Sequence, residues 1–207
     1  MNRRTTILAA VLAAVVALAA MPALAQEANT SQRPERPERS YPPAWVDETV
    51  DELRARVAER TVAAEQRIAD SDRLTDEQKT QAIANLAEAT AAIAAADETA
   101  EIVGIAVSRA QLQRIEWRAT RRGDVPDYDE HIARDLDRDT RRYDHLVRIA
   151  GWAEIAGVDV SGVNTYLGEA SGQLTVAGGS GTVEERHDAV HIARAWMTQA
   201  HTTLMAE

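Results

Sequence analysis

The segment Leu86-Ala-Glu-Ala-Thr-Ala-Ala-Ile93 has a degraded copy 81 positions later, Leu167-Gly-Glu-Ala-Ser-Gly-Gln-Leu174. The same offset relates Arg67-Ile68-Ala69 to Arg148-Ile149-Ala150. It also aligns two stripes of apolar residues: Ala82, Leu86, Ala89, Ile93 and Ala96 with Val163, Leu167, Ala170, Leu174 and Ala177. Apolar residues spaced by three and four positions form one face of an α-helix. The chain is therefore predicted to contain two copies of one helical unit.

Working outward from this repeat, the apolar spacing predicts six helices, over residues 45–69, 75–96, 97–121, 127–156, 160–177 and 182–204. Thr75-x-x-Gln78 and Thr182-x-x-Glu185 are capping boxes, which satisfy free backbone donors at helix starts. The spacing in 160–177 is the most regular and matches a coiled-coil seam. In 127–156 the inward side chains are expected to be Ile132, Leu136, Tyr143, Val147 and Ala150.

The segment Gly123-Asp-Val-Pro126 is the clearest boundary between the helices. It separates residues 45–122 from residues 127–207, each with three expected helices joined by short connections. Short connections favour antiparallel neighbours, and no useful stretch alternates with the period of two that strands require. The predicted fold is all-α, with two tandem three-helix units that form an antiparallel and elongated bundle.

The N-terminus, residues 1–25, has the pattern of a signal peptide. Arg3 and Arg4 precede the apolar run Ile7–Met21, and Ala23-Leu24-Ala25 is a cleavage site. An uncleaved anchor is the alternative, but the run has 15 residues and a spanning helix needs ~20. The protein is therefore expected to be exported, with no transmembrane segment after cleavage. Residues 26–44 are rich in Pro and charge, and are predicted to form a disordered linker.

The charge of the chain argues against nucleic acid as a partner. Lys and Arg number 23, Asp and Glu number 33, and the net charge is −10. Loss of Arg3 and Arg4 with the signal peptide would bring it to −12. Such a surface repels phosphate backbones. The chain has no Cys, which excludes a disulfide framework, a thiolate metal site and a Cys nucleophile.

The candidate metal ligands are His187 and His191 in His187-Asp-Ala-Val-His191. Two imidazoles four positions apart lie on one helix face and can share a divalent transition metal. Asp188 stands where zinc peptidases have a longer Glu general base, which argues against proteolysis. A third ligand would have to come from His131, His145 or an acid on a neighbouring helix. The alternative is that His187 packs at the edge of its apolar stripe.

Other patterns are weaker. The triplet Asp135-x-Asp137-x-Asp139 resembles the start of a calcium loop but lacks its Gly and its final Glu, which favours a solvated face paired with arginines. No motif supports a Ser/His/Asp nucleophile. Four tryptophans are expected to fill a core that lacks Phe, with a ligand groove as the alternative: Trp45, Trp117, Trp152 and Trp196.

The turns Arg73-Leu-Thr-Asp-Glu-Gln-Lys79 and Ala156-Gly-Val-Asp-Val-Ser161, with the segment Asn85–Ile93, resemble those of uncharacterised exported, alanine-rich helical proteins of actinobacteria. The resemblance covers residues 67–177 and consists of helix-turn signatures. It implies an exported helical protein. That family has no established activity, so the resemblance implies no site residues and no cofactor.

These observations predict a non-enzymatic exported protein with a structural or protein-binding role at the cell envelope or outside the cell. No complete catalytic set accompanies the amphipathic helices, and no cofactor is expected. The first alternative is a metal-binding protein that uses His187 and His191. The second is a small-molecule binder with an apolar cleft between the two units.

Overall fold

The computed structural model describes residues 43–72 and 74–206. The predicted signal peptide and residues 26–42 of the predicted linker lie outside the described residues. The described part is all-helical, without strands, as the spacing of apolar residues predicts. Its elements are η2 (Ala44–Asp47), α2 (Val50–Ala69), α3 (Asp76–Ala95), α4 (Thr99–Arg122), α5 (Tyr128–Ile155), α6 (Ser161–Ala177) and α7 (Val183–Ala206).

Several helices begin where a side chain caps the backbone. The Thr75 side chain accepts from the Gln78 backbone N–H and the Gln78 side chain returns the bond, which confirms the predicted capping box at the start of α3. Thr182 and Glu185 make the same exchange before α7. The Asp127 carboxylate accepts from the backbone N–H of Glu130 at the start of α5.

The first helix begins later than the sequence indicates. Residues Ala44–Asp47 form a short 3₁₀ turn, and α2 starts at Val50. The reason is a capping box at Thr49 and Glu52, in which each side chain bonds the backbone N–H of the other residue. Trp45 of the turn is buried against the core, so the residue packs inward although it precedes the helix.

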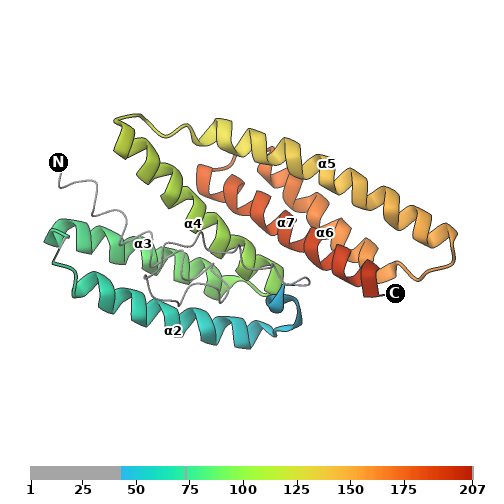
Figure 1. The fold of residues 1–207 in the computed structure, drawn as a ribbon, viewed down its shortest axis with the longest axis horizontal. Coiled ribbons are helices and arrows are strands. Elements are labelled where there is room, and N and C mark those ends of the chain that lie inside the picture. The colour runs from blue at the N-terminus through green and yellow to red at the C-terminus, as the bar shows by residue number, and fades with distance from the viewer. Residues whose placement is uncertain (1–42, 73, 207) are drawn as a thin grey trace, which may run out of the picture.

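A main apolar core runs through the molecule, beside a smaller cluster of buried apolar residues around Ile132 and Val190. The main core contains buried residues from η2 and from all six α-helices, so it crosses the predicted boundary between the two halves of the chain. The α7 helix is its centre, because it packs on α4, α5 and α6 (Figure 1). The helices α2, α3 and α4 lie on one side of the molecule and α5 and α6 lie on the other. The division into residues 45–122 and 127–207 stays a prediction.

The α4 helix carries the contact between the two halves. Its Gly104 lies directly against the backbone of Ile192 on α7, which only a residue without a side chain allows. At its C-terminal end, Gly123 adopts a φ of +77° and turns the chain toward α5. The packing of α4 on α7 therefore explains how the two halves share one core.

The inward face of α5 differs from the expected one at one position. Ile132 and Ala150 are buried as predicted, but Val147 is exposed, and Leu146 and Asp139 are buried instead. The buried face follows positions 132, 139, 146 and 150, and residue 147 lies about 100° around the helix from residue 146. None of the helices in the described part of the chain combines the length and the apolar character needed to cross a membrane.

Candidate functional site

The two candidate ligands, His187 and His191, lie on α7 with their rings facing each other. The ring centroids are 4.7 Å apart, and both residues are 2% exposed. His187 packs in the interior, as the alternative to a metal site has it, and it is deeply buried because helices surround α7 on several sides and leave it few exposed positions. Burial on this scale makes a polar side chain depend on partners inside the protein.

The partner of His187 is Ser108 on α4. The Ser108 hydroxyl lies 2.8 Å from His187 Nδ1, and it also bonds the carboxylate of Asp188, which Arg109 holds at 2.9 Å. Because a hydroxyl has one proton and gives it to the carboxylate, its oxygen accepts from His187 Nδ1–H. Burial lowers the pKa of His187 to about 4, so the ring is neutral at pH 7.

This chain of contacts differs from a Ser/His/Asp nucleophile. In a catalytic triad the histidine stands between serine and acid and takes the hydroxyl proton. Here Ser108 stands in the middle and donates to Asp188. Ser108 is also fully buried, so no substrate carbonyl reaches its oxygen. The arrangement links α4 to α7 and supplies no activated nucleophile.

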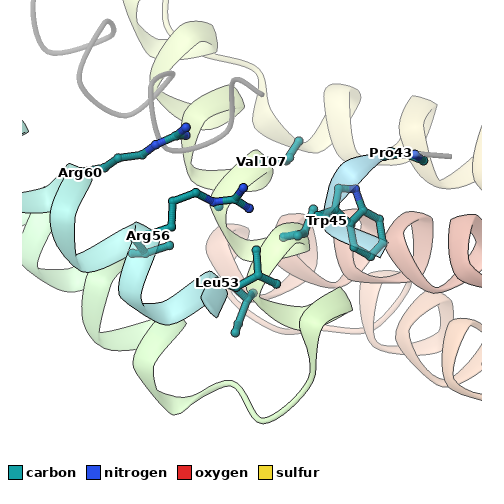
Figure 2. Close-up of a pocket in the computed structure, with 10 residues that line it drawn as sticks. Pro43, Trp45, Leu53, Arg56, Arg60 and Val107 are labelled. Atoms are coloured by element: carbon teal, nitrogen blue, oxygen red, sulfur yellow. The ribbon is translucent and has the colours of Figure 1, made fainter. Parts of the chain in front are cut away.

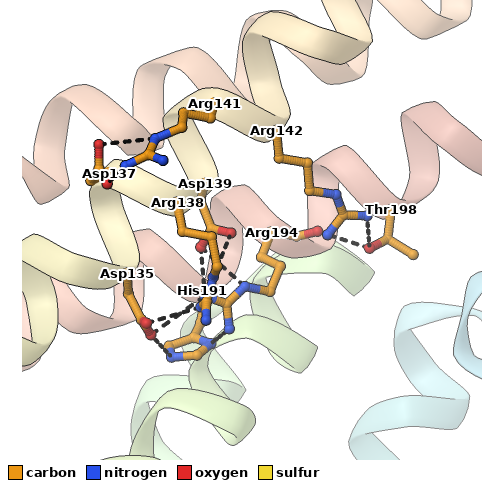
Figure 3. Close-up of polar contacts among 9 residues, drawn as sticks. All are labelled: Asp135, Asp137, Arg138, Asp139, Arg141, Arg142, His191, Arg194 and Thr198. Atoms are coloured by element: carbon orange, nitrogen blue, oxygen red, sulfur yellow. Dashed lines mark hydrogen bonds and ion pairs between the residues drawn. The ribbon is translucent and has the colours of Figure 1, made fainter.

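The neighbours of His191 are Arg194 on α7 and Asp135 on α5 (Figure 3). Arg194 Nη1 lies 3.2 Å from His191 Nδ1, and because a guanidinium only donates, the ring proton is on Nε2. That buried Nε2 has no hydrogen-bond partner among the described residues and lies 4.0 Å from Asp135 Oδ2. Burial, and then the charge of Arg194, lower the pKa of His191 to about 2.

Arg194 also binds the buried carboxylate of Asp139. Its Nε and Nη2 lie 3.1 Å and 2.5 Å from Asp139 Oδ2, and its Nη2 lies 3.4 Å from Asp135 Oδ2. Asp137 points away and pairs with Arg141 on the exposed side of α5 (Figure 3). Asp137 therefore diverges from the other two, as expected of alternate residues on a helix, whereas Asp135 and Asp139 are one turn apart and both face Arg194. The solvated-face interpretation is right for Asp137 and wrong for Asp139.

The histidines form a pair and not a larger cluster of ligands. Within residues 43–72 and 74–206, no three His, Cys, Asp or Glu side chains lie where they could share one metal ion. Of the two histidines considered as further ligands, His131 is near enough for its charge to act on His187. His145 is exposed and acts on His201 instead. Metal binding by His187 and His191 stays a prediction.

A cavity of about 270 Å³ lies between α3 and α4 on one side and the first turns of α5 and α7 on the other. Its lining is mixed: Glu88, Glu116 and Glu184 lie beside Arg109 and several apolar side chains. Burial raises the pKa of Tyr128 in this cavity, and the charges of Glu116 and Glu184 raise it further. The cavity between the two halves therefore combines apolar walls with carboxylates, and a bound small molecule stays a prediction.

A second cavity, of about 250 Å³, lies within the first half of the chain between η2, α2 and α4 (Figure 2). Trp45, Leu53 and Ile102 give it apolar walls, and Arg56 and Arg60 also line it (Figure 2). Glu48 already pairs with Arg56 at 2.7 Å. The cavity is thus a small apolar recess with two arginines in its lining, and Arg56 has an acid beside it.

The tryptophans divide into two kinds. Trp45 and Trp196 are buried as expected, and the ring of Trp196 stacks on Tyr166 with centroids 5.6 Å apart. Trp152, near the end of α5, is exposed, so the expectation that it fills the core is wrong. The side chain of Trp117 lies outside what the structure describes.

The residues that sequence reasoning missed are the buried partners, Ser108 on α4 and Asp139 on α5. Each stands between apolar residues at helical spacing, Ser108 between Ile105 and Leu112, and Asp139 between Leu136 and Tyr143. A polar residue at an inward position was the available signal. A scan against family models and searches of curated proteins and solved structures gave no match.

Proposed function

We propose that this protein is exported and acts without catalysis, as a structural or protein-binding component at the cell envelope or outside the cell. One observation carries the binding role. Three apolar side chains on the C-terminal half of α5, which we name the α5 face, are exposed: Val147 at 42%, Trp152 at 67% and Ile155 at 86%.

Packing of the described residues does not require the side chains of the α5 face, because these side chains are exposed. The core contacts of this half of α5 come from other positions of the helix, where Leu146 and Ala150 are buried. Tryptophan is among the residues that contribute most to protein interfaces, because it removes a large apolar area from water on binding. Exposed apolar side chains that lie together commonly mark interaction sites.

The absence of catalysis is supported by how the polar groups are used. Ser108 and His187 bond each other in the interior, and Asp188 is held by Arg109. Arg194 is engaged with Asp139 and His191. These groups stabilise the contacts of α7 with α4 and α5. None of the hydrogen bonds arranges a base beside an accessible nucleophile, which covalent catalysis requires.

The binding role is tested with the mature protein, residues 26–207, immobilised and exposed to the envelope and secreted fractions of the source cells. We expect a bound protein that is lost with Trp152→Glu/Ile155→Glu and kept with Val62→Glu, a matched change at an exposed apolar residue of α2. Equal binding by both variants would contradict the role of the α5 face. A hydrolase activity of the purified protein would contradict the non-enzymatic part.

The alternative is a metal-binding protein that uses His187 and His191. It is favoured by the buried Nε2 of His191, which has no hydrogen-bond partner in the described part of the chain. It is opposed by the guanidinium of Arg194 beside the same ring, because a positive charge repels a metal cation. The metal content of the purified protein distinguishes the two proposals.

A further inference from the structure

We propose that the partner of the α5 face is a second copy of this chain, packed as an antiparallel α5–α5 pair whose helices cross at Gly151. This inference rests on the proposed binding role and names the partner. Three features support this partner: the open helical position of Gly151, the exposed apolar side chains near it, and the near-neutral charge of residues 147–158.

Gly151 occupies a helical position at which a side chain would meet no other described residue. Among residues 43–72 and 74–206, a Cβ atom built there has no neighbour within 4 Å, and the backbone is ordinary helix, without a positive φ. Glycine inside a helix costs about 1 kcal/mol relative to alanine. Packing within the chain does not offset that cost. A glycine at such a position permits close approach of another backbone, as Gly104 does for Ile192 within this chain.

The exposed apolar side chains surround Gly151. Val147 is one turn before it and Ile155 one turn after it, and residues four apart share a helix face. Trp152 follows Gly151 in the sequence, points about 100° around the helix from it, and is exposed as well. The opposite side of α5 is occupied by α7 and α6, and α5 lies at the edge of the bundle (Figure 1). The α5 face is thus free to receive another helix along its length.

The charge of this segment suits a second copy. The whole chain has a net charge of −10, so two copies repel each other over most of their surfaces. Residues 147–158 contain one basic and one acidic side chain, Arg148 and Glu154. The segment is locally neutral and allows two copies to meet without like-charge repulsion. In an antiparallel pair, Arg148 of one copy reaches the ring of Trp152 in the other, an attractive cation–π contact.

The test is sedimentation velocity of the mature protein, residues 26–207, over a series of concentrations. We expect a dimer. Gly151→Leu should weaken dimerisation about tenfold or more in dissociation constant, because the larger side chain keeps the helices apart, while leucine favours the helix of each monomer. Trp152→Glu should have the same effect. Gly168→Leu is the matched control on α6, at a helical glycine that is also open, and should leave the dimer intact.

Circular dichroism of each variant checks that the monomer stays folded. A wild-type protein that is monomeric at every concentration would overturn the inference. So would a dimer that survives both Gly151→Leu and Trp152→Glu. If the wild type is monomeric and still binds another protein through the α5 face, the second copy is the wrong partner and the binding role stands. If it is monomeric and binds nothing through this face, both proposals fail.

Discussion

A Cβ atom placed on Gly104 of α4 would stand 2.5 Å from Cα of Ile192 on α7, closer than real Cβ contacts come. The backbones of the two helices therefore touch at this point. Because α7 is the centre of the shared core, the contact of Gly104 with Ile192 sets the distance between the two halves of the chain.

Replacement of Gly104 by alanine should destabilise the protein. Alanine favours helix by about 1 kcal/mol over glycine, but the methyl group must push α4 away from backbone atoms that cannot rotate aside, and overpacking of this kind costs about 1–3 kcal/mol. Urea denaturation measures the difference. Gly168→Ala, at an open helical position, should instead raise the stability slightly. Equal effects of the two changes would contradict the close approach.

Loss of the Asp139 carboxylate should be costly, because it leaves Arg194 beside the core without its main acid. Removal of one partner from a buried pair costs about 3–5 kcal/mol. Asp139→Ala should lower the free energy of unfolding by that order. Asp137→Ala, which breaks the exposed pair with Arg141, should cost about 1 kcal/mol or less. Similar losses for Asp137 and Asp139 would show that the buried pair does not hold α5 to α7.

The buried His187 should make the protein less stable in acid. Its pKa is lowered from 6.5 to about 4, so the unfolded chain takes up the proton first as the pH falls. Stability is unaffected above pH 6.5 and decreases between pH 6.5 and about 4, by about 3 kcal/mol at ~1.4 kcal/mol per pKa unit. The raised pKa of Asp188, which burial causes, acts in the opposite direction.

The variant His187→Gln separates the contribution of His187 to the pH dependence from that of Asp188. His187→Gln removes the titrating ring and keeps an amide that can donate to Ser108. Chemical denaturation at a series of pH values should show a shallower loss of stability for the variant between pH 6.5 and 4. The slopes are compared, and not the absolute stabilities, because glutamine also packs differently. Identical slopes for the wild type and the variant would contradict a neutral buried His187.

The purified protein should retain little metal after incubation with zinc, copper, iron or calcium. Zinc sites use three or four protein ligands, and His187 and His191 supply two, with Arg194 beside one of them. Elemental analysis after dialysis measures the metal content. Near-stoichiometric metal that is lost in His187→Ala/His191→Ala would establish the metal-binding alternative.

Much of the fold follows from local sequence signals. The capping box at Thr75 marks where α3 begins, and the apolar spacing gives its buried face. The box at Thr49 and Glu52 has the same form and sets the true start of α2. What the spacing cannot give is which helix becomes central. The burial of His187 and His191 depends on the position of α7 among its neighbours, which is a property of tertiary packing.

The site was only partly predictable for the same reason. The pairing of Asp139 with Arg194 joins residues 55 positions apart, and no local pattern links them. That Asp139 stands at an inward position is readable from the stripe on α5. The exposure of Trp152 could not be predicted from the sequence, because a tryptophan in a chain without Phe is ordinarily expected in the core.

Binding of a protein by the α5 face is tested most directly by site-specific photo-crosslinking in the cells that produce the protein. A photoreactive residue replaces Ile155 in one variant and the exposed Val62 of α2 in the other. We expect a defined crosslinked product from position 155 and none from position 62. A product of twice the protein's mass would identify a second copy as the partner. No product from position 155, or the same products from both positions, would contradict binding by the α5 face.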